Sequence, residues 1–352
     1  VYVGDKCRAD FGDIRFTNAE GTELDYWMEV NATTYADFWV ELDTVGTTTT
    51  IYIYYGNSSA TTTSNGDATF IFFDDFDGTA LNTSKWTLSG SGSATVSSGI
   101  LTLTTNVVGY TRLLNTSATY GDNIIMESRI QTNAAGNNVY RYQDLSLSDA
   151  TFKKSLSSQF ALNGKNSRYR NADAVGSPAY STLDMSPAWV ASTYKIITLK
   201  RHSTAEWQQD RANTQTLATH CPTDNLSPLF VVYSYNTSYY ATTLVDWILV
   251  RTYTSTEPTH SAWGTEQDLS ATSFTIRITP TSGTDPLSVS YNLSINEALD
   301  NFTLSYGDGA KYTGNDITSF ATTHTYNTPG TYTVWAEGYN EFATHVFYEI
   351  PY

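Results

Sequence analysis

The feature that most constrains the fold is a long succession of short strand-like runs, with almost no helical periodicity. Between residues 70 and 266 these runs include GILTLTTN, NIIMESRIQT, KIITLKRH, SPLFVVYSYN and VDWILVRTY. They are rich in β-branched and aromatic residues, which fit a pleated, half-buried surface. Evenly spaced strands over such a length predict an all-β fold, with a two-sheet sandwich or jelly roll in this region.

Polar stretches divide the chain into three regions. SSATTTSNGDAT covers residues 58–69, and EQDLSATS covers residues 266–273. Both read as linkers or exposed crossovers. They predict an N-terminal β domain over 1–64, a jelly roll over 65–266 and a third domain over 271–352. The third region has a hairpin signal at residues 307–309 and a length that suits a seven-stranded immunoglobulin-like sandwich.

Charge and the chain start restrict the class of protein. The net charge is −16, which disfavours nucleic-acid binding because phosphate binding needs clustered Lys and Arg. No apolar run has the length of a membrane span. The chain begins with Val1 rather than Met. This start suggests removal of a signal peptide, and we therefore expect an extracellular or cell-surface protein.

Two cysteines, Cys7 and Cys221, lie far apart in the sequence and have no metal-ligand spacing. In a secreted chain they are candidates for a long-range disulfide. The alternative is a pair of buried thiols.

Three family resemblances rest on specific motifs. CRADFGDIRFTNAEGTELDYWMEV, followed by FWVEL and TTTTIYIYYGN, resembles the domain DUF2341, which occurs in secreted and surface proteins of archaea and bacteria. FFDDFDGTALNTSKW and VDWILVRTY resemble the two ends of a concanavalin A-like (laminin-G or lectin-type) jelly roll, including that of family-16 glycoside hydrolases. YGDG followed by HTYNTPGTYTVWAEGYNEFA resembles a PKD domain.

The jelly-roll region lacks the carboxylate pattern of family-16 enzymes. Those enzymes carry their catalytic carboxylates on one strand, in the pattern Glu-x-Asp-x-x-Glu or Glu-x-Asp-x-Glu. Alternate residues of the strand then face one cleft. Here Glu127 and Glu206 are the only glutamates between residue 70 and the region's last strand-like run, VDWILVRTY, and neither has an Asp two residues on. The sequence therefore predicts a protein that is not an enzyme.

A structural Ca²⁺ is the only cofactor that the sequence suggests. In family-16 relatives an ion is held between the first and last strands by the counterpart of Asp246 and by backbone carbonyls beside the counterpart of Gly78. Asp77 is adjacent, and oxygen ligands suit Ca²⁺. The alternative is a solvated turn stabilised by its own Asp side chains.

Carbohydrate binding is a natural activity for a noncatalytic jelly roll. Trp189 and Trp207 stand in loop-like contexts and are candidate sugar-stacking residues, as are Tyr239 and Tyr240. The alternative for each ring is ordinary packing.

Eight Asn-x-Ser/Thr sites occur, and Asn225 is the poorest because Pro228 follows it. The remaining candidates for glycosylation are Asn31, Asn57, Asn82, Asn115, Asn236, Asn292 and Asn301.

Two functions fit these observations. The first is a noncatalytic structural or adhesive subunit of a surface filament or other homo-oligomer. The second is a carbohydrate-binding module of a secreted protein, and hydrolysis ranks third. DUF2341 members normally carry further strand sequence before KCRADFGDIRF. Either the chain was trimmed and the domain tolerates the loss, or another segment fills the gap. Our hypothesis is that a strand from a neighbouring subunit completes this domain.

Overall fold

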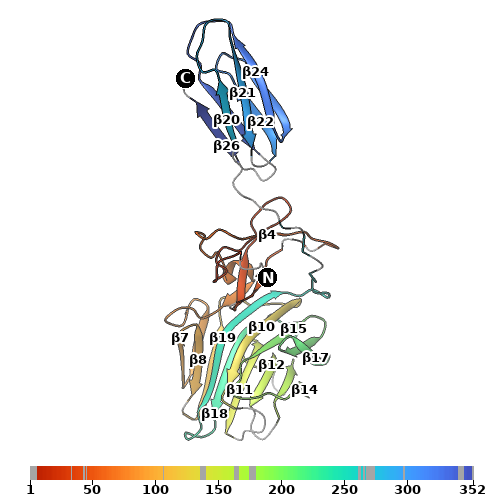
Figure 1. The fold of residues 1–352 in the computed structure, drawn as a ribbon. Coiled ribbons are helices and arrows are strands. Elements are labelled where there is room, and N and C mark those ends of the chain that lie inside the picture. The colour runs from red at the N-terminus through yellow and green to blue at the C-terminus, as the bar shows by residue number, and fades with distance from the viewer. Residues whose placement is uncertain are drawn as a thin grey trace. The chain divides into compact units, whose positions relative to one another are not determined.

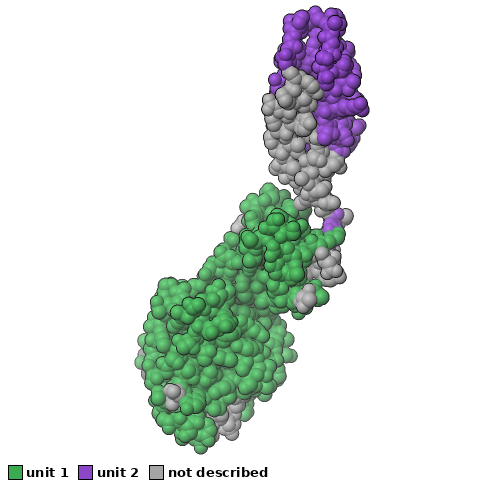
Figure 2. Space-filling view, turned by 60° about the vertical axis from the view of Figure 1, so that its left-hand side comes forward, with its two compact units in different colours: residues 1–259 green, residues 260–352 purple. Residues whose placement is uncertain are grey.

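The computed structural model describes residues 6–32, 34–42, 44, 46–105, 107–134, 140–161, 166–173, 180–260, 263–264, 266, 274–295, 298–339 and 345–350. The chain forms two compact units, residues 1–259 and 260–352 (Figure 1, Figure 2). The first unit contains the predicted region 1–64 and nearly all of the predicted region 65–266. The predicted strand exchange concerns the segment at residues 1–5, which lies outside the described residues.

The first unit begins with a small β region, residues 6–69, which we call the head. It contains two antiparallel pairs: β1 (Arg15–Thr17) with β4 (Tyr52–Tyr54), and β2 (Tyr26–Asn31) with β3 (Ala36–Val40). Phe16, Tyr26 and Phe38 meet edge to face at 5.3–5.7 Å between ring centroids and form the head's core. A single helical turn, α1 (Gly66–Thr69), follows and is capped by Asn65.

The rest of the first unit is a sandwich of two antiparallel sheets, which confirms the predicted jelly roll (Figure 1). The back sheet has the order β17 (Ala212–Leu217), β16 (Ala205–Gln209), β15 (Lys195–Arg201), β10 (Ile124–Thr132), β19 (Ala241–Thr252), β8 (Ile100–Thr105) and β7 (Ser93–Ser97), with β5 (Phe72–Asp74) also paired to β19. The front sheet has the order β14 (Tyr180–Asp184), β13 (Arg168–Ala172), β12 (Ser155–Ala161), β11 (Arg141–Ser148), β18 (Ser227–Ser234), β9 (Gly109–Asn115) and β6 (Trp86–Gly90).

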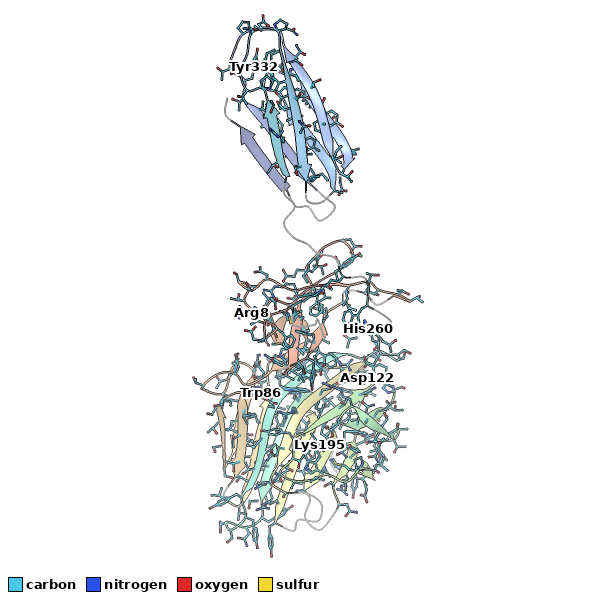
Figure 3. All side chains as sticks on the ribbon, in the orientation of Figure 1. Arg8, Trp86, Asp122, Lys195, His260 and Tyr332 are labelled. Atoms are coloured by element: carbon cyan, nitrogen blue, oxygen red, sulfur yellow. The ribbon has the colours of Figure 1, made fainter. Side chains whose placement is uncertain are left out.

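Alternation along each strand decides which side chains enter the sandwich. On β8, Leu101 and Leu103 are fully buried, whereas the threonines beside them are partly exposed. Trp86 lies between the sheets, 5.6 Å from Phe72 and 5.7 Å from Phe230 (Figure 3). The apolar residues of both sheets thus form one core.

The head packs on the outer face of the back sheet through aromatic residues. Trp27 of the head contacts Phe73 at 4.8 Å and Trp247 of β19 at 5.5 Å, between ring centroids. Trp39 adds a further ring against this cluster, which also includes Phe70. The outer face of the back sheet is therefore occupied over these residues, which leaves the front sheet as the sandwich's other broad surface.

An ion cluster lies beside these rings. Glu127 on β10 is 1% exposed and binds Arg211 at 2.7 Å and Arg251 at 3.2 Å. Arg211 also binds Glu29 of the head at 2.8 Å, and Trp39 lies 5.0 Å from both guanidinium groups. The head and the back sheet are thus joined by charge as well as by aromatic packing.

The second unit is a separate two-sheet sandwich with its own core, as the length of the third region predicts. One sheet consists of β20 (Phe274–Thr279), β21 (Leu287–Ile295) and β24 (Phe320–Tyr326), and the other of β23 (Lys311–Ile317), β22 (Leu299–Ser305), β25 (Val334–Tyr339) and β26 (His345–Ile350). The predicted hairpin joins β22 to β23, and Gly307 and Gly309 take positive φ angles of 83° and 96° in its turn. Within the described ranges, no helix is long and apolar enough to cross a membrane.

Candidate functional site

Trp189 and Trp207 are buried, and the prediction that they form a sugar platform is wrong. Trp207 is 0% exposed and stacks on Tyr169 at 5.1 Å between ring centroids. Trp189 is 4% exposed, and its indole Nε1 donates to Thr132 Oγ1 at 2.7 Å. Neither ring can contact a ligand in solution, because other side chains already cover its faces.

The two cysteines are not joined, so the predicted disulfide is also wrong. Cys7 packs in the head, whereas Cys221 packs against the jelly-roll core. Asn171 Nδ2 contacts Cys221 Sγ at 3.1 Å, and burial raises the pKa of the Cys221 thiol. Each sulfur therefore belongs to a different core.

The structure divides the glycosylation candidates. Asn115 is 1% exposed and donates through Nδ2 to Lys85 O, so its prediction as an acceptor is wrong. The others are exposed or, for Asn236, half-buried, and they remain candidates: Asn31, Asn57, Asn82, Asn236, Asn292 and Asn301.

The calcium site stays a prediction. Asp246 forms an ion pair with Arg129 of β10, on one edge of β19. Asp77 and Gly78 are exposed and follow β5, which pairs with the opposite edge of β19. Among the described residues no three His, Cys, Asp or Glu side chains are grouped as metal ligands.

The outer face of the front sheet, which we call the front face, carries an unusual row of polar side chains. Leu145 and Leu147 of β11 point into the core, so Tyr142, Asp144 and Ser146 point outward. The strand register extends this pattern across the sheet. One row crossing its middle consists of Ser89, Arg112, Val231, Asp144, Gln159, Arg168 and Asp184.

Asp144 is the most perturbed group of this row. It is 3% exposed, and Tyr142 Oη donates to its Oδ2 at 2.5 Å. Burial raises the pKa of Asp144 to about 6, although the Tyr142 hydrogen bond and the charge of Arg170 act to lower it. Its other oxygen, Oδ1, makes no hydrogen bond of normal geometry among the described residues. This oxygen is buried, and Ser146 and Gln159 are nearby donors that act to lower the pKa of Asp144.

Polar neighbours on adjacent strands hold this region in place. Gln159 Nε2 donates to Tyr142 Oη at 3.2 Å, and Arg168 Nε donates to Gln159 Oε1 at 2.9 Å. Arg170 lies over Tyr180 at 5.1 Å. The half-buried hydroxyl of Tyr142 and the guanidinium groups of Arg168 and Arg170 can thus reach the hydroxyls of a sugar, and the buried amide and carboxylate orient them.

A group of six tyrosines, which we call the tyrosine patch, adjoins Asp144. The rings of Tyr110 and Tyr233 lie 4.3 Å apart, Tyr235 is 4.3 Å from Tyr233, and Tyr142 is 6.4 Å from Tyr110. Tyr235 N donates to Tyr140 O, which connects these four rings to two further tyrosines. The remaining pair of the patch is Tyr140 and Tyr239, stacked at 4.3 Å.

Four of these rings are substantially exposed: Tyr110, Tyr140, Tyr235 and Tyr239. Exposed flat rings next to directed polar groups are the arrangement that a sugar-binding surface needs. Tyr239 and the neighbouring Tyr240, which the sequence singled out, lie here, whereas the two tryptophans do not.

No second carboxylate stands at glycosidase spacing from Asp144 on the described strands of the front sheet. Asp184 is in the same row but three strands away, about 14 Å along the sheet. Glycosidase pairs lie about 5–10 Å apart. Glu127 and Glu206 both belong to the back sheet. The front face therefore holds one perturbed acid rather than a pair.

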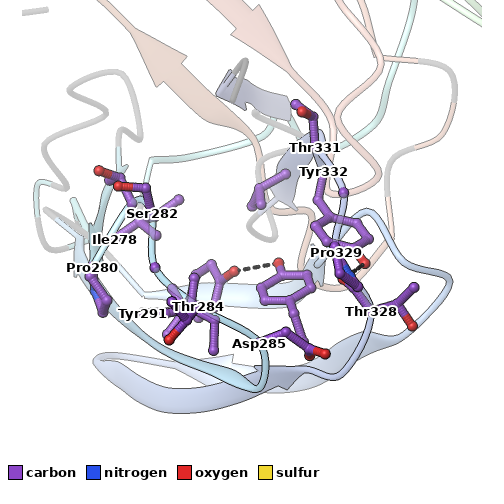
Figure 4. Close-up of a pocket in the computed structure, with 17 residues that line it drawn as sticks. Ile278, Pro280, Ser282, Thr284, Asp285, Tyr291, Thr328, Pro329, Thr331 and Tyr332 are labelled. Carbon is purple, nitrogen blue, oxygen red and sulfur yellow. Dashed lines mark hydrogen bonds between the residues drawn. The ribbon is translucent and has the colours of Figure 1, made fainter.

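The second unit contains a pocket of about 530 Å³ between its two sheets, at the β20–β21 turn (Figure 4). Tyr291 Oη lies 2.7 Å from Tyr326 Oη, which donates to Tyr306 O at 2.7 Å. Tyr332 Oη donates to Thr328 O. The tyrosine hydroxyls of this pocket thus bond within the protein, and its walls are mainly apolar.

Comparison with known proteins confirms one of the three resemblances. Residues 10–89 match the family described as a domain of unknown function, DUF2341. No curated protein matches the chain. The matched segment covers the head and continues through α1 and β5 into β6.

Solved structures with a similar fold cover about half of this chain. A glycosyl hydrolase family protein from Mycobacterium fortuitum is 17% identical, with a TM-score of 0.41 over 51% of this chain and 99% of that one. A beta-1,3-glucanase from Mycobacterium marinum is 14% identical, with a TM-score of 0.41 over 51% and 98%. An immunostimulatory antigen and pseudo beta-1,3-glucanase of Mycobacterium tuberculosis is 17% identical, with a TM-score of 0.41 over 53% and 99%. Residues 10–89 thus resemble DUF2341, and the two large sheets of the first unit form a jelly-roll sandwich.

Proposed function

We propose that this protein is a noncatalytic, extracellular carbohydrate-binding protein, and that the front face is its binding surface. The observation that carries the proposal is the continuity between the tyrosine patch and the polar groups around Asp144. Rings supply stacking surfaces, and the half-buried Tyr142, Arg168 and Arg170 supply directional hydrogen bonds. Asp144 and Gln159 are each 3% exposed and hold the Tyr142 hydroxyl and the Arg168 guanidinium in place. The solitary acid supports binding without hydrolysis, since both glycosidase mechanisms need a pair.

The test is retention of the full chain on a panel of immobilised neutral and acidic polysaccharides. Loss of one stacking ring weakens binding roughly three- to tenfold. We therefore expect Tyr110→Ala and Tyr239→Ala each to reduce affinity for whichever polysaccharide retains the protein. Tyr52→Ala is the matched control, because Tyr52 is also exposed but lies on β4 of the head.

Two results would contradict this function. One is failure of every polysaccharide in the panel to retain the protein. The other is sugar release from a polysaccharide at a rate that Asp144→Asn abolishes, which would make the front face a hydrolase site.

A second proposal is that the protein assembles with copies of itself at the cell surface, as a filament subunit. Its support is the head, whose described strands form two-stranded sheets. Residues 22–24 meet the outer edge of β1 and residues 64–65 that of β2, which leaves the edge of β4 as one that another chain can extend. Ile51, Tyr52 and Ile71 are also exposed in and beside this region. Electron micrographs of the purified protein should show filaments or lattices. Monodisperse monomers at high concentration would rule this role out.

A further inference from the structure

The arginines of this chain fall into two classes. Six of the eleven have a carboxylate partner: Arg8, Arg15, Arg129, Arg201, Arg211 and Arg251. The other five have no such partner among the described residues: Arg112, Arg141, Arg168, Arg170 and Arg277. Four of these five lie on strands of the front sheet, at β9, β11 and β13. In a protein with a net charge of −16, this concentration of unpaired cations on one surface needs an explanation.

Three of these arginines point outward on the front face. Arg112, Arg168 and Arg170 are each half-buried. Arg112 lies between two rings, 4.4 Å from Tyr110 and 4.5 Å from Phe152, which holds the guanidinium in a fixed orientation. Arg112 and Arg168 are four strands apart, about 19 Å along the sheet. The cations thus flank the region around Asp144 on both sides.

Arg168 and Arg170 are neighbours on the same face of β13, two residues apart. Burial lowers the pKa of Arg168, and the positive charge of Arg170 lowers it further. Among the described residues neither arginine forms an ion pair, although Asp184 lies opposite Arg168 on β14 and the charge of Arg170 acts on Asp144. A bound anion would offset the repulsion between the two like charges further. Guanidinium groups also match the geometry of carboxylate and sulfate oxygens.

We propose that the ligand of the front face is an acidic polysaccharide, whose sugar units carry carboxylate or sulfate groups that bind Arg112, Arg168 and Arg170. This inference rests on the proposed carbohydrate-binding function and specifies its ligand class. The tyrosine patch stacks on sugar rings, and the arginines neutralise the anionic substituents. Because the protein has a net charge of −16, the rest of its surface repels polyanions. Specific binding of an acidic polysaccharide therefore depends on the front face.

The test compares polysaccharides that differ only in charge. Polygalacturonate is compared with its methyl ester, and dextran sulfate with dextran, by titration of the full chain at neutral pH and low salt. We expect one acidic polymer to bind and its uncharged counterpart to bind at least tenfold more weakly. Added salt should weaken the acidic interaction. The polygalacturonate pair tests carboxylate groups and the dextran pair tests sulfate groups, so the two sources of negative charge are distinguished.

Variants locate the interaction. Arg168→Gln and Arg170→Gln should each weaken binding of the acidic polymer about tenfold or more, since each removes a charge-assisted hydrogen bond. Arg277→Gln is the matched control, because Arg277 is exposed, has no ion pair with any described carboxylate and belongs to the second unit. If a variant fails to fold, the comparison of charged and uncharged polymers on the wild-type protein still tests the proposal.

The outcomes distinguish this inference from the function on which it rests. Equal binding of a polymer and its uncharged counterpart would overturn the inference and leave carbohydrate binding intact. An equal loss on Arg277→Gln would also overturn it, because the charge would then act from outside the front face. If no polysaccharide of any kind binds, the proposed function fails and the inference fails with it.

Discussion

At the scale of single residues, Asp144 shows how the fold creates a property that its sequence neighbours do not reveal. QDLSLSD contains an ordinary acidic residue on an alternating strand. Its pKa of about 6 arises from burial in the folded sheet, against which Tyr142 on its own strand and Arg170 and Gln159 on other strands act. A search for glutamates at glycosidase spacing could not find it. The alternating serines of β11 and β12 were the available signal that one face of these strands is polar.

The raised pKa of Asp144 predicts a specific pH dependence. A carboxyl whose pKa is higher in the folded state holds its proton more tightly there, so its contribution to stability is largest near pH 4 and falls as pH rises to about 6. The difference from an ordinary Asp corresponds to about 3 kcal/mol. Asp144→Asn removes this cost, so the variant should be the more stable protein above pH 7 and lose its advantage near pH 4. Urea unfolding of both proteins across this range measures the difference, and parallel pH profiles would contradict it.

At the same scale, the two tryptophans show why surface aromatics are hard to identify from sequence. Trp207 was assigned to a loop-like context, but AEWQQ forms β16, whose alternate residues are buried. Trp189 does lie outside a strand, yet its ring is covered by Phe160 at 4.3 Å. The exposed rings are tyrosines, and their exposure depends on which sheet face each strand presents.

At the scale of elements, strand content was predictable and strand pairing was not. The alternating runs quoted for β8, β10, β15, β18 and β19 all form strands. However, β9 pairs with β18 across more than a hundred residues, and that pairing places Arg112 two strands from Asp144. Register between distant strands is set by tertiary packing. The same reason explains why the ion cluster under the head was not foreseen.

The ion cluster yields a prediction for the junction between the head and the back sheet. Glu127→Gln leaves Arg211 and Arg251 short of their shared buried carboxylate, and we expect a loss of about 3 kcal/mol or more in the free energy of unfolding. Glu257→Gln removes an exposed partner of the same Arg251 and should cost less than about 1 kcal/mol. Denaturant unfolding of the two variants provides the comparison. Equal effects would mean that burial of Glu127 does not govern this junction.

At the scale of the whole molecule, the two broad faces of the jelly roll have different roles. The back sheet is joined to the head by a cluster of aromatic rings and by the ion cluster around Glu127. The front face carries the tyrosine patch, Asp144 and three outward arginines for which the described residues show no ion pair. The resemblance to a jelly roll predicted the sandwich, but only the folded chain shows that one face is covered and the other presents polar and aromatic side chains.

The most direct test of this account is to locate a bound oligosaccharide on the intact protein. Amide hydrogen exchange of the full chain would be followed with and without a saturating oligosaccharide of whichever acidic polymer binds in the titrations. The account predicts slower exchange in β9, β11, β12, β13 and β18, with no change in β10, β15, β16 or the second unit. Protection confined to the back sheet or to the second unit, or no protection at any strand, would contradict the assignment of the front face as the binding surface.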